Sequence, residues 1–143
     1  MPAPSRTLLT HLPKGHEFPR TAFDLTVQDV SRYLDAVEDT NVMYGERALA
    51  PPLAVAARAL GALLDVLELP AGTLHTGQEV EAHAGVPVGA RLTLGGRIAQ
   101  RSERAGLVIS VIEFEVTPAG SEAPALTGRT TVMAPMPASG GAA

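Results

Sequence analysis

Histidine is the residue type in this sequence best suited to proton transfer, because an imidazole ordinarily changes its charge close to neutral pH. Four histidines occur, at positions 11, 16, 75 and 83. Strand alternation after Thr73 predicts one polar face that consists of His75, Gly77, Glu79, Glu81 and His83. His75 is therefore a candidate catalytic residue, and the alternative is a polar strand with an incidental histidine. His11 and His16 fall in an irregular N-terminal stretch, and we assign them no role.

Other chemistries are disfavoured by composition and spacing. The sequence contains no cysteine, which excludes a thiolate nucleophile and a metal site built on thiolates. No two histidines have the spacing of metal ligands, so we expect no metal. Gly95 and Gly96 do not precede a helix, so they do not indicate a phosphate-binding loop. No serine lies in a nucleophile elbow.

The overall composition argues against nucleic acid and membrane partners. The net charge is −4, and the aromatic residues are three Phe and two Tyr, without Trp. A nucleic-acid surface needs basic patches and stacking platforms. No apolar run approaches the roughly 20 residues that span a bilayer, and the N-terminus lacks the apolar stretch of a signal peptide. We therefore expect a cytoplasmic protein without nucleic acid or membrane partners.

The elements that must position any site begin with a helix after Leu25. Thr26 is predicted to cap this helix, with Asp29 completing a capping box. Val30, Tyr33, Leu34 and Val37 then form an apolar stripe. The stretch 39–50 loses this period and reads as a loop. The 143 residues fit one domain, over 1–134, and the Pro- and Gly-rich residues 135–143 are expected to form a flexible tail.

A second helix is predicted over residues 51–67, because prolines suit a first turn and the following run is apolar around most of its circumference. We expect Leu53, Ala57, Leu60 and Leu64 to face a sheet. After Gly72 the period changes to two, which predicts strands at 73–84, 91–100, 107–117 and 125–134. Short extended segments are also expected at 5–12 and 16–24. Short connections favour an antiparallel meander wrapped around the helix, which is the α+β hotdog fold.

Four sequence segments resemble the MaoC-like dehydratase family, of the N-terminal, FAS1-like type. They are Tyr33–Tyr44 (YLDAVEDTNVMY), Ala50–Leu53 (APPL), and Leu74–Glu79 (LHTGQE) with Val86–Gly89 (VPVG). The order and spacing of these segments carry the resemblance, which extends over roughly residues 20–134. The resemblance implies a hotdog domain that acts on acyl thioesters of coenzyme A or of acyl carrier protein.

The resemblance also assigns candidate catalytic residues. In the family, a D-x-N-P-x-H motif supplies an Asp and a His for the hydration of an enoyl thioester. Here Asp39 and Asn41 match the motif, Val42 replaces the Pro, and Tyr44 stands at the position of the His. A phenol titrates near pH 10 and is a poor substitute for an imidazole in proton transfer at neutral pH. Asp39, Asn41, Tyr44 and His75 are thus the catalytic candidates.

Substrate contacts are expected at the start of the second helix. In hotdog enzymes a backbone N–H there polarises the thioester carbonyl, assisted by the partial positive charge of the helix terminus. Because Pro51 and Pro52 have no N–H, the donors would come from Leu53, Ala54 or a residue before Pro51. The arginines at 91, 97, 101 and 104 are read as solvated charges, or alternatively as contacts for the phosphates of coenzyme A.

The functional expectation is a protein of the enoyl hydratase and 3-hydroxyacyl dehydratase lineage. It would be weakly active or would form the substrate-binding half of a two-hotdog assembly. The alternatives are an acyl-CoA thioesterase, with Glu38 or Asp39 as the carboxylate, and a non-catalytic structural or ligand-binding subunit. Coenzyme A would enter only as part of the substrate, and no separate cofactor is expected. Open sheet edges predict a homodimer or pairing with a second hotdog chain.

Overall fold

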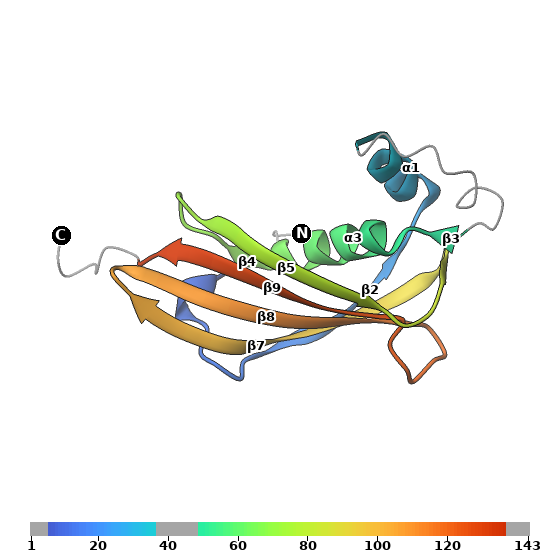
Figure 1. Ribbon diagram of the computed structural model, residues 1–143. Helices are drawn as coiled ribbons and strands as arrows, with labels where there is room; N and C mark the ends of the chain where they lie inside the picture. The colour runs from blue at the N-terminus through green and yellow to red at the C-terminus, as the bar shows by residue number, and fades with distance from the viewer. Residues whose placement is uncertain (1–5, 37–48, 137–143) are drawn as a thin grey trace, which may run out of the picture.

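The protein consists of a long antiparallel sheet curved around one central helix (Figure 1). The computed structural model describes residues 6–36 and 49–136. The elements are β1 (Thr7–Leu8), the 3₁₀ helix η1 (Leu9–His11), β2 (Glu17–Asp24), α1 (Val27–Ala36), β3 (Leu49–Ala50), α3 (Pro52–Leu64), β4 (Leu67–Glu68), β5 (Leu74–Ala82), β6 (Val86–Pro87), β7 (Arg91–Arg104), β8 (Leu107–Pro118) and β9 (Leu126–Pro135). This arrangement confirms the α+β hotdog fold.

The main sheet has the strand order β2-β7-β8-β9-β5, with β5 at one edge and β2 at the other. Only β7, β8 and β9 form a consecutive meander, because β5 pairs antiparallel with β9 and not with β7. The chain between β5 and β7 passes through β6, which pairs with β3 just before α3. The predicted simple meander of all four strands was therefore wrong in the placement of its first strand. The extended segment at 16–24 is confirmed as β2.

The predicted end of the strand at residue 100 was also wrong. Strand β7 continues to Arg104 and joins β8 through a tight turn in which Ala105 has φ 52° and Gly106 has φ 79°. Positive φ at both central residues is the geometry of a two-residue hairpin turn. The charged run before Gly106 looked like a loop in the sequence. It is the largely exposed end of a strand that extends beyond the core.

Helix α1 begins as predicted. The Thr26 N–H donates to Asp29 Oδ2 and the Asp29 N–H donates to Thr26 Oγ1, both at 3.0 Å. These reciprocal bonds are a capping box, which satisfies backbone donors that the first helical turn would leave unpaired. Val30 is buried on the predicted apolar face.

Helix α3 is shorter than predicted, because it ends at Leu64 and residues 67–68 form β4, which pairs with β1. Its orientation also differs. Leu60 is buried as predicted, whereas Leu53, Ala57 and Leu64 are exposed. The buried face of the helix consists of Ala54, Val55, Ala56, Ala59, Leu60 and Leu63. Small alanines on that face allow the helix to approach the sheet closely, so side-chain size alone did not identify the buried side.

Candidate functional site

Helix α1 is held against the N-terminal half of α3 by a charged contact. Arg58 of α3 lies 3.4 Å from Asp29 Oδ2, and its guanidinium stacks 5.0 Å from the ring centroid of Phe23 in β2. Burial of the Asp29 carboxyl raises its pKa, but the hydrogen bonds from Thr26 and the charges of Arg58 and Arg32 outweigh burial and lower the pKa below its usual value. The capping residue of α1 thus also fixes α1 to the central helix.

Three of the four catalytic candidates, Asp39, Asn41 and Tyr44, lie outside the described residues, as does Glu38. The description stops at Ala36, the end of α1, and resumes at Leu49 in β3, which leads directly into α3. Their convergence at the start of α3 stays a prediction.

The start of α3 offers one backbone donor. The Ala54 and Val55 amides both donate to the Pro51 carbonyl, at 2.9 and 3.2 Å. Pro52 has no N–H. Within the described parts of the chain no hydrogen bond of the Leu53 N–H is found, and the Leu53 side chain is 53% exposed. Of the two predicted substrate contacts, Leu53 can therefore offer its amide to a ligand, while Ala54 is buried and its amide is already bonded.

His75 lies on a different face from the one predicted. A β-bulge between His75 and Gly77 shifts the register, so that His75 is opposite Val132 and Gln78 is opposite Thr130. Val132 and Thr130 are buried on the inner face of the sheet, which is the face toward α3. His75 shares that inner face with Gln78, whereas Glu79 and Glu81 are on the outer face, opposite Arg129 and Thr127.

The residue that sequence reasoning missed is Thr130. Its hydroxyl is hydrogen-bonded to His75 Nε2, and it is only 2% exposed. The buried hydroxyl fixes the orientation of an imidazole that is itself exposed at the sheet edge. The alternation of β9 could have indicated that Thr130 faces inward, but only the bulge, which has no clear sequence signal, brings His75 to the same side.

His75 does not lie near the start of its own α3. The start of α3 follows β3, which pairs with β6 just beyond the C-terminal end of β5. His75 is at the opposite end of β5, roughly 20 Å away along the strand. One chain therefore does not bring His75 and the Leu53 amide together.

A row of exposed apolar side chains runs along one side of α3. On the helical wheel, Leu53, Ala57 and Leu64 fall within one stripe, roughly 100–140° around the axis from Arg58. The stripe therefore lies away from the side of the helix on which Arg58 contacts Phe23 of β2. We call these three residues the apolar flank of α3.

An apolar cavity of about 210 Å³ lies at the other end of the helix. It is lined by residues of the N-terminal segment, β2, β7 and the end of α3, among them Phe18, Leu63 and Leu94. Leu63 is roughly 15 Å from Leu53 along the helix axis. A short acyl chain bound at the Leu53 amide would not reach this cavity.

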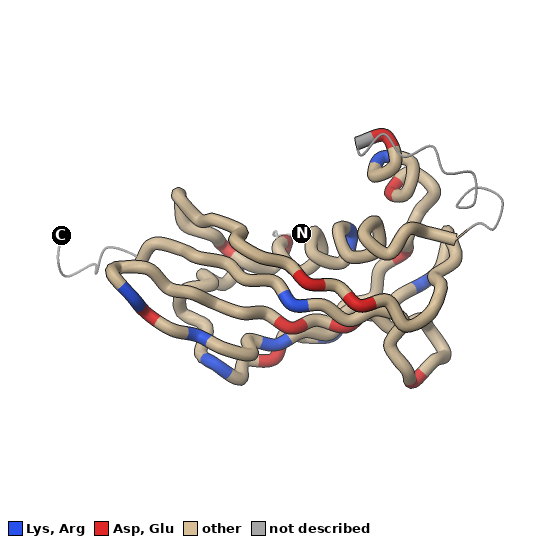
Figure 2. The backbone as a smooth tube through the Cα atoms, in the orientation of Figure 1, with Lys and Arg blue, Asp and Glu red and all other residues tan. Residues whose placement is uncertain are grey.

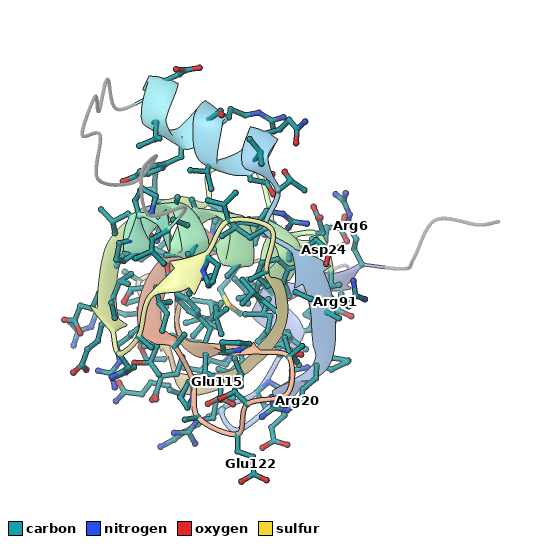
Figure 3. The ribbon with its side chains drawn as sticks, turned by 90° about the vertical axis from the view of Figure 1, so that its right-hand side faces the viewer. Arg6, Arg20, Asp24, Arg91, Glu115 and Glu122 are labelled. Atoms are coloured by element: carbon teal, nitrogen blue, oxygen red, sulfur yellow. The ribbon has the colours of Figure 1, made fainter. Side chains whose placement is uncertain are left out.

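The arginines proposed as phosphate contacts are largely engaged by carboxylates. Arg91 pairs with Asp24 at 3.0 Å and Arg97 with Glu113 at 3.5 Å. Arg101 pairs with Glu103 at 2.9 Å and donates to the Thr10 carbonyl at 2.7 Å, which ties the N-terminal segment to β7. Figure 3 shows the related outer-face pairs, with Arg20 directed toward Glu115 and Arg91 beside Asp24. These pairs favour the interpretation as solvated surface charge.

Among the described residues, no group of three or more His, Asp or Glu side chains is arranged to hold a metal ion. Nor does that part of the chain contain a helix that is long and apolar enough to cross a membrane.

Comparison with known proteins identifies the family. A model of the FAS1-like, dehydratase domain region matches residues 13–121, which is more than half of the chain. The chain belongs to this family. No match to a curated protein was found. The resemblance seen in the sequence to the MaoC-like hotdog dehydratases is thereby confirmed.

Solved structures show that other proteins share this fold. The (R)-hydratase from A. caviae involved in PHA biosynthesis is 20% identical, with a TM-score of 0.70 over 89% of this chain and 98% of the hydratase. The HadBC 3R-hydroxyacyl-ACP dehydratase complex from Mycobacterium tuberculosis gives 22% identity and a TM-score of 0.72, over 87% of this chain and 99% of the matched one. A MaoC-like dehydratase from Rhodospirillum rubrum is 13% identical, with a TM-score of 0.71 over 92% of this chain and 98% of the dehydratase.

Proposed function

We propose that this chain binds acyl thioesters of coenzyme A or acyl carrier protein as one half of a two-hotdog hydratase or dehydratase. The observation that carries the proposal is the Leu53 amide at the start of the central helix, which makes no hydrogen bond to any of the described residues. The partial positive charge at this terminus favours a carbonyl oxygen that gains negative charge. The (R)-hydratase and the 3R-hydroxyacyl-ACP dehydratase among the structural neighbours have related chemistry.

Hydration of a trans-2-enoyl thioester requires a base that activates water and an acid that protonates the α-carbon. We propose Asp39 as the base, with Asn41 orienting the water. Tyr44, in place of an imidazole, can hydrogen-bond to the thioester but does not readily exchange a proton at neutral pH. The chain by itself is therefore expected to bind the substrate and to hydrate it slowly or not at all.

The position of His75 supports a site completed between two chains. Suppose that β5 pairs antiparallel with the matching strand of another hotdog, and that the centre of the pairing lies at any position from 78 to 81. Position 75 would then lie opposite a position near 81–87 of the partner strand, in the numbering of this chain. In this fold those positions lie beside β6 and β3, and hence beside the start of the central helix. Edge pairing would thus bring His75, on the inner face, toward the partner's thioester site.

Recognition of the thioester carbonyl can be tested without altering the protein. We expect isothermal titration calorimetry to show that butyryl-CoA binds about fivefold to tenfold more tightly than S-butyl-CoA, the thioether without a carbonyl, since one hydrogen bond contributes roughly 1 kcal/mol. A Leu53→Ala variant should preserve this ratio, because it retains the amide. Equal affinities for the two ligands, or no binding of either, would refute the proposal.

A further inference from the structure

We infer that the apolar cavity at the end of α3 is a second ligand site, which takes a small neutral molecule with an apolar body and one hydroxyl group. This site is separate from the proposed thioester site, because it lies at the other end and on another side of the central helix. Its construction, its lining and its position each point to such a ligand.

One wall of the cavity is the N-terminal segment, residues 6–16, which is fixed to the rest of the fold at both ends. Near its start, the Thr7 N–H donates to the Val66 carbonyl at 3.1 Å. At its end, the Ile98 N–H donates to the His16 carbonyl at 2.8 Å. The wall is therefore part of the folded chain, and the cavity is formed before any ligand enters it.

The empty volume is not forced by crowding around it. Ala62 lines the cavity from α3 and is half-buried, so a larger side chain at this position could fill part of the space. An unfilled apolar cavity costs stability, because its walls lose packing contacts. Its volume of about 210 Å³ exceeds that of an apolar cavity of roughly 150 Å³ that holds benzene. One ring with one or two substituents, roughly seven to nine non-hydrogen atoms, would therefore fit.

The lining favours a neutral ligand. Its body consists of buried side chains that are each 2–8% exposed, namely Leu12, Phe18, Leu63, Leu67 and Leu94. None of the described residues that line the cavity is Lys, Arg, Asp or Glu. Figure 2 shows charged positions spread along the strands of the main sheet, whereas the central helix is largely without them. Because a buried charge without a partner is costly, a carboxylate or a phosphate would bind poorly.

His16 supplies a polar group for the ligand. It is half-buried in the lining, and its ring packs edge-on against the Phe18 ring with 5.2 Å between the centroids. No hydrogen bond of the His16 ring to another described residue is found. An imidazole can donate or accept a hydrogen bond, so it can pair with a hydroxyl group in either tautomer.

The cavity faces away from the apolar flank of α3. Ala62 follows Leu53 by nine residues, which places it about 180° around the helix axis. An acyl chain held at the Leu53 amide would have to pass around the helix to enter the cavity. The occupant is therefore a separate molecule.

The probes are p-cresol, toluene, which lacks the hydroxyl, and 4-methylbenzoate, which carries a charge. In NMR titrations of the full chain with labelled leucine methyl groups, we expect p-cresol to bind with a Kd on the order of 1 mM. Binding should shift the methyl signals of Leu12, Leu63 and Leu94, which line the cavity. 4-Methylbenzoate should bind at least about tenfold more weakly than p-cresol, because its charge would be buried without a partner.

The role of His16 is tested by His16→Phe, which keeps an aromatic ring against Phe18 and removes the hydrogen bond. This variant should bind p-cresol about fivefold to tenfold more weakly, and its affinity for toluene should stay within about twofold of wild type. Equal weakening for the two ligands would overturn the assignment of the hydroxyl to His16.

A matched pair of variants tests the location. Ala62→Leu reduces the cavity and should weaken both p-cresol and toluene at least about tenfold, whereas Ala57→Leu makes the same change at an exposed position of the same helix and should weaken neither. In wild type, saturating p-cresol without a shift at the three leucines would overturn the inference, and this result requires no variant to fold. No thioester is used, so failure here would leave the proposed function standing.

Discussion

Single residues at the start of α1 link local helix chemistry to the packing of the site. Asp29 accepts the Thr26 N–H and also contacts Arg58 on the central helix, so one carboxylate acts in a cap and in an ion pair. Its side chain is 21% exposed, which makes its charge more effective than that of a fully solvated pair. This carboxylate therefore links the start of α1 to the central helix.

The lowered pKa of Asp29 predicts a specific pH dependence of stability. A carboxyl whose pKa is lower in the folded state stabilises the protein above its unfolded pKa, near 3.8, and this contribution is lost as the pH falls through the folded value. Asp29→Asn should cost about 1 kcal/mol in the free energy of unfolding at neutral pH. In urea titrations, the difference from wild type should shrink below about pH 4.

The control for this measurement is Asp24→Asn, which removes a carboxylate from an exposed ion pair with Arg91 whose side chains are 57% and 61% exposed. Its effect should be close to zero at every pH. An Asp29→Asn effect that stays constant down to pH 3 would mean that the charge of Asp29 does not stabilise the folded state.

At the scale of elements, the helix and strand patterns predicted much of the fold but not its details. The capping box at Thr26 and the long apolar helix with a proline start were readable because local hydrogen bonding and periodicity determine them. The bulge at Thr76 was not readable, because it depends on how β5 matches β9. The inner position of His75 therefore escaped the sequence analysis.

The exposed side of α3 was mispredicted for a related reason. Because α3 is apolar around most of its circumference, its sequence does not show which side faces solvent. The sequence could therefore not distinguish Leu60, which is buried, from Leu53 and Leu64, which are exposed. The close fit of Gly128 under Phe114 is likewise a tertiary feature. A Cβ on Gly128 would clash with the ring of Phe114, and only the strand register reveals this. The catalytic candidates at 39–44 came from family resemblance and lie outside the described residues.

The orientation of α3 gives a direct stability prediction. Leu60→Ala should lower the free energy of unfolding by roughly 2–5 kcal/mol, because it removes buried surface and leaves a cavity against the sheet. Leu53→Ala, at a position 53% exposed, should cost less than about 1 kcal/mol in the isolated chain. Chemical denaturation monitored by circular dichroism measures both. Equal losses for the two variants would contradict the observed orientation of the helix.

At the scale of the whole molecule, the described residues form a hotdog fold in which the Leu53 amide and His75 lie near opposite ends of β5. Under the proposed function, a second hotdog chain beside β5 would complete the site. The absence of a histidine at position 44 fits a chain that contributes binding surface and depends on its partner for proton transfer.

The most direct test of this account is the rate of crotonyl-CoA hydration by wild type, Tyr44→His and Asp39→Asn/Tyr44→His. Purified wild type should hydrate crotonyl-CoA slowly or not at all. Tyr44→His restores the acid–base pair of the family, and a positioned proton-transfer group contributes about 10²–10⁴-fold, so a gain within that range is expected. The gain should vanish in the double variant, because it requires the Asp39 carboxylate. Robust wild-type turnover that survives Asp39→Asn would contradict the account and would place the chemistry on other residues, with His75 the first to test.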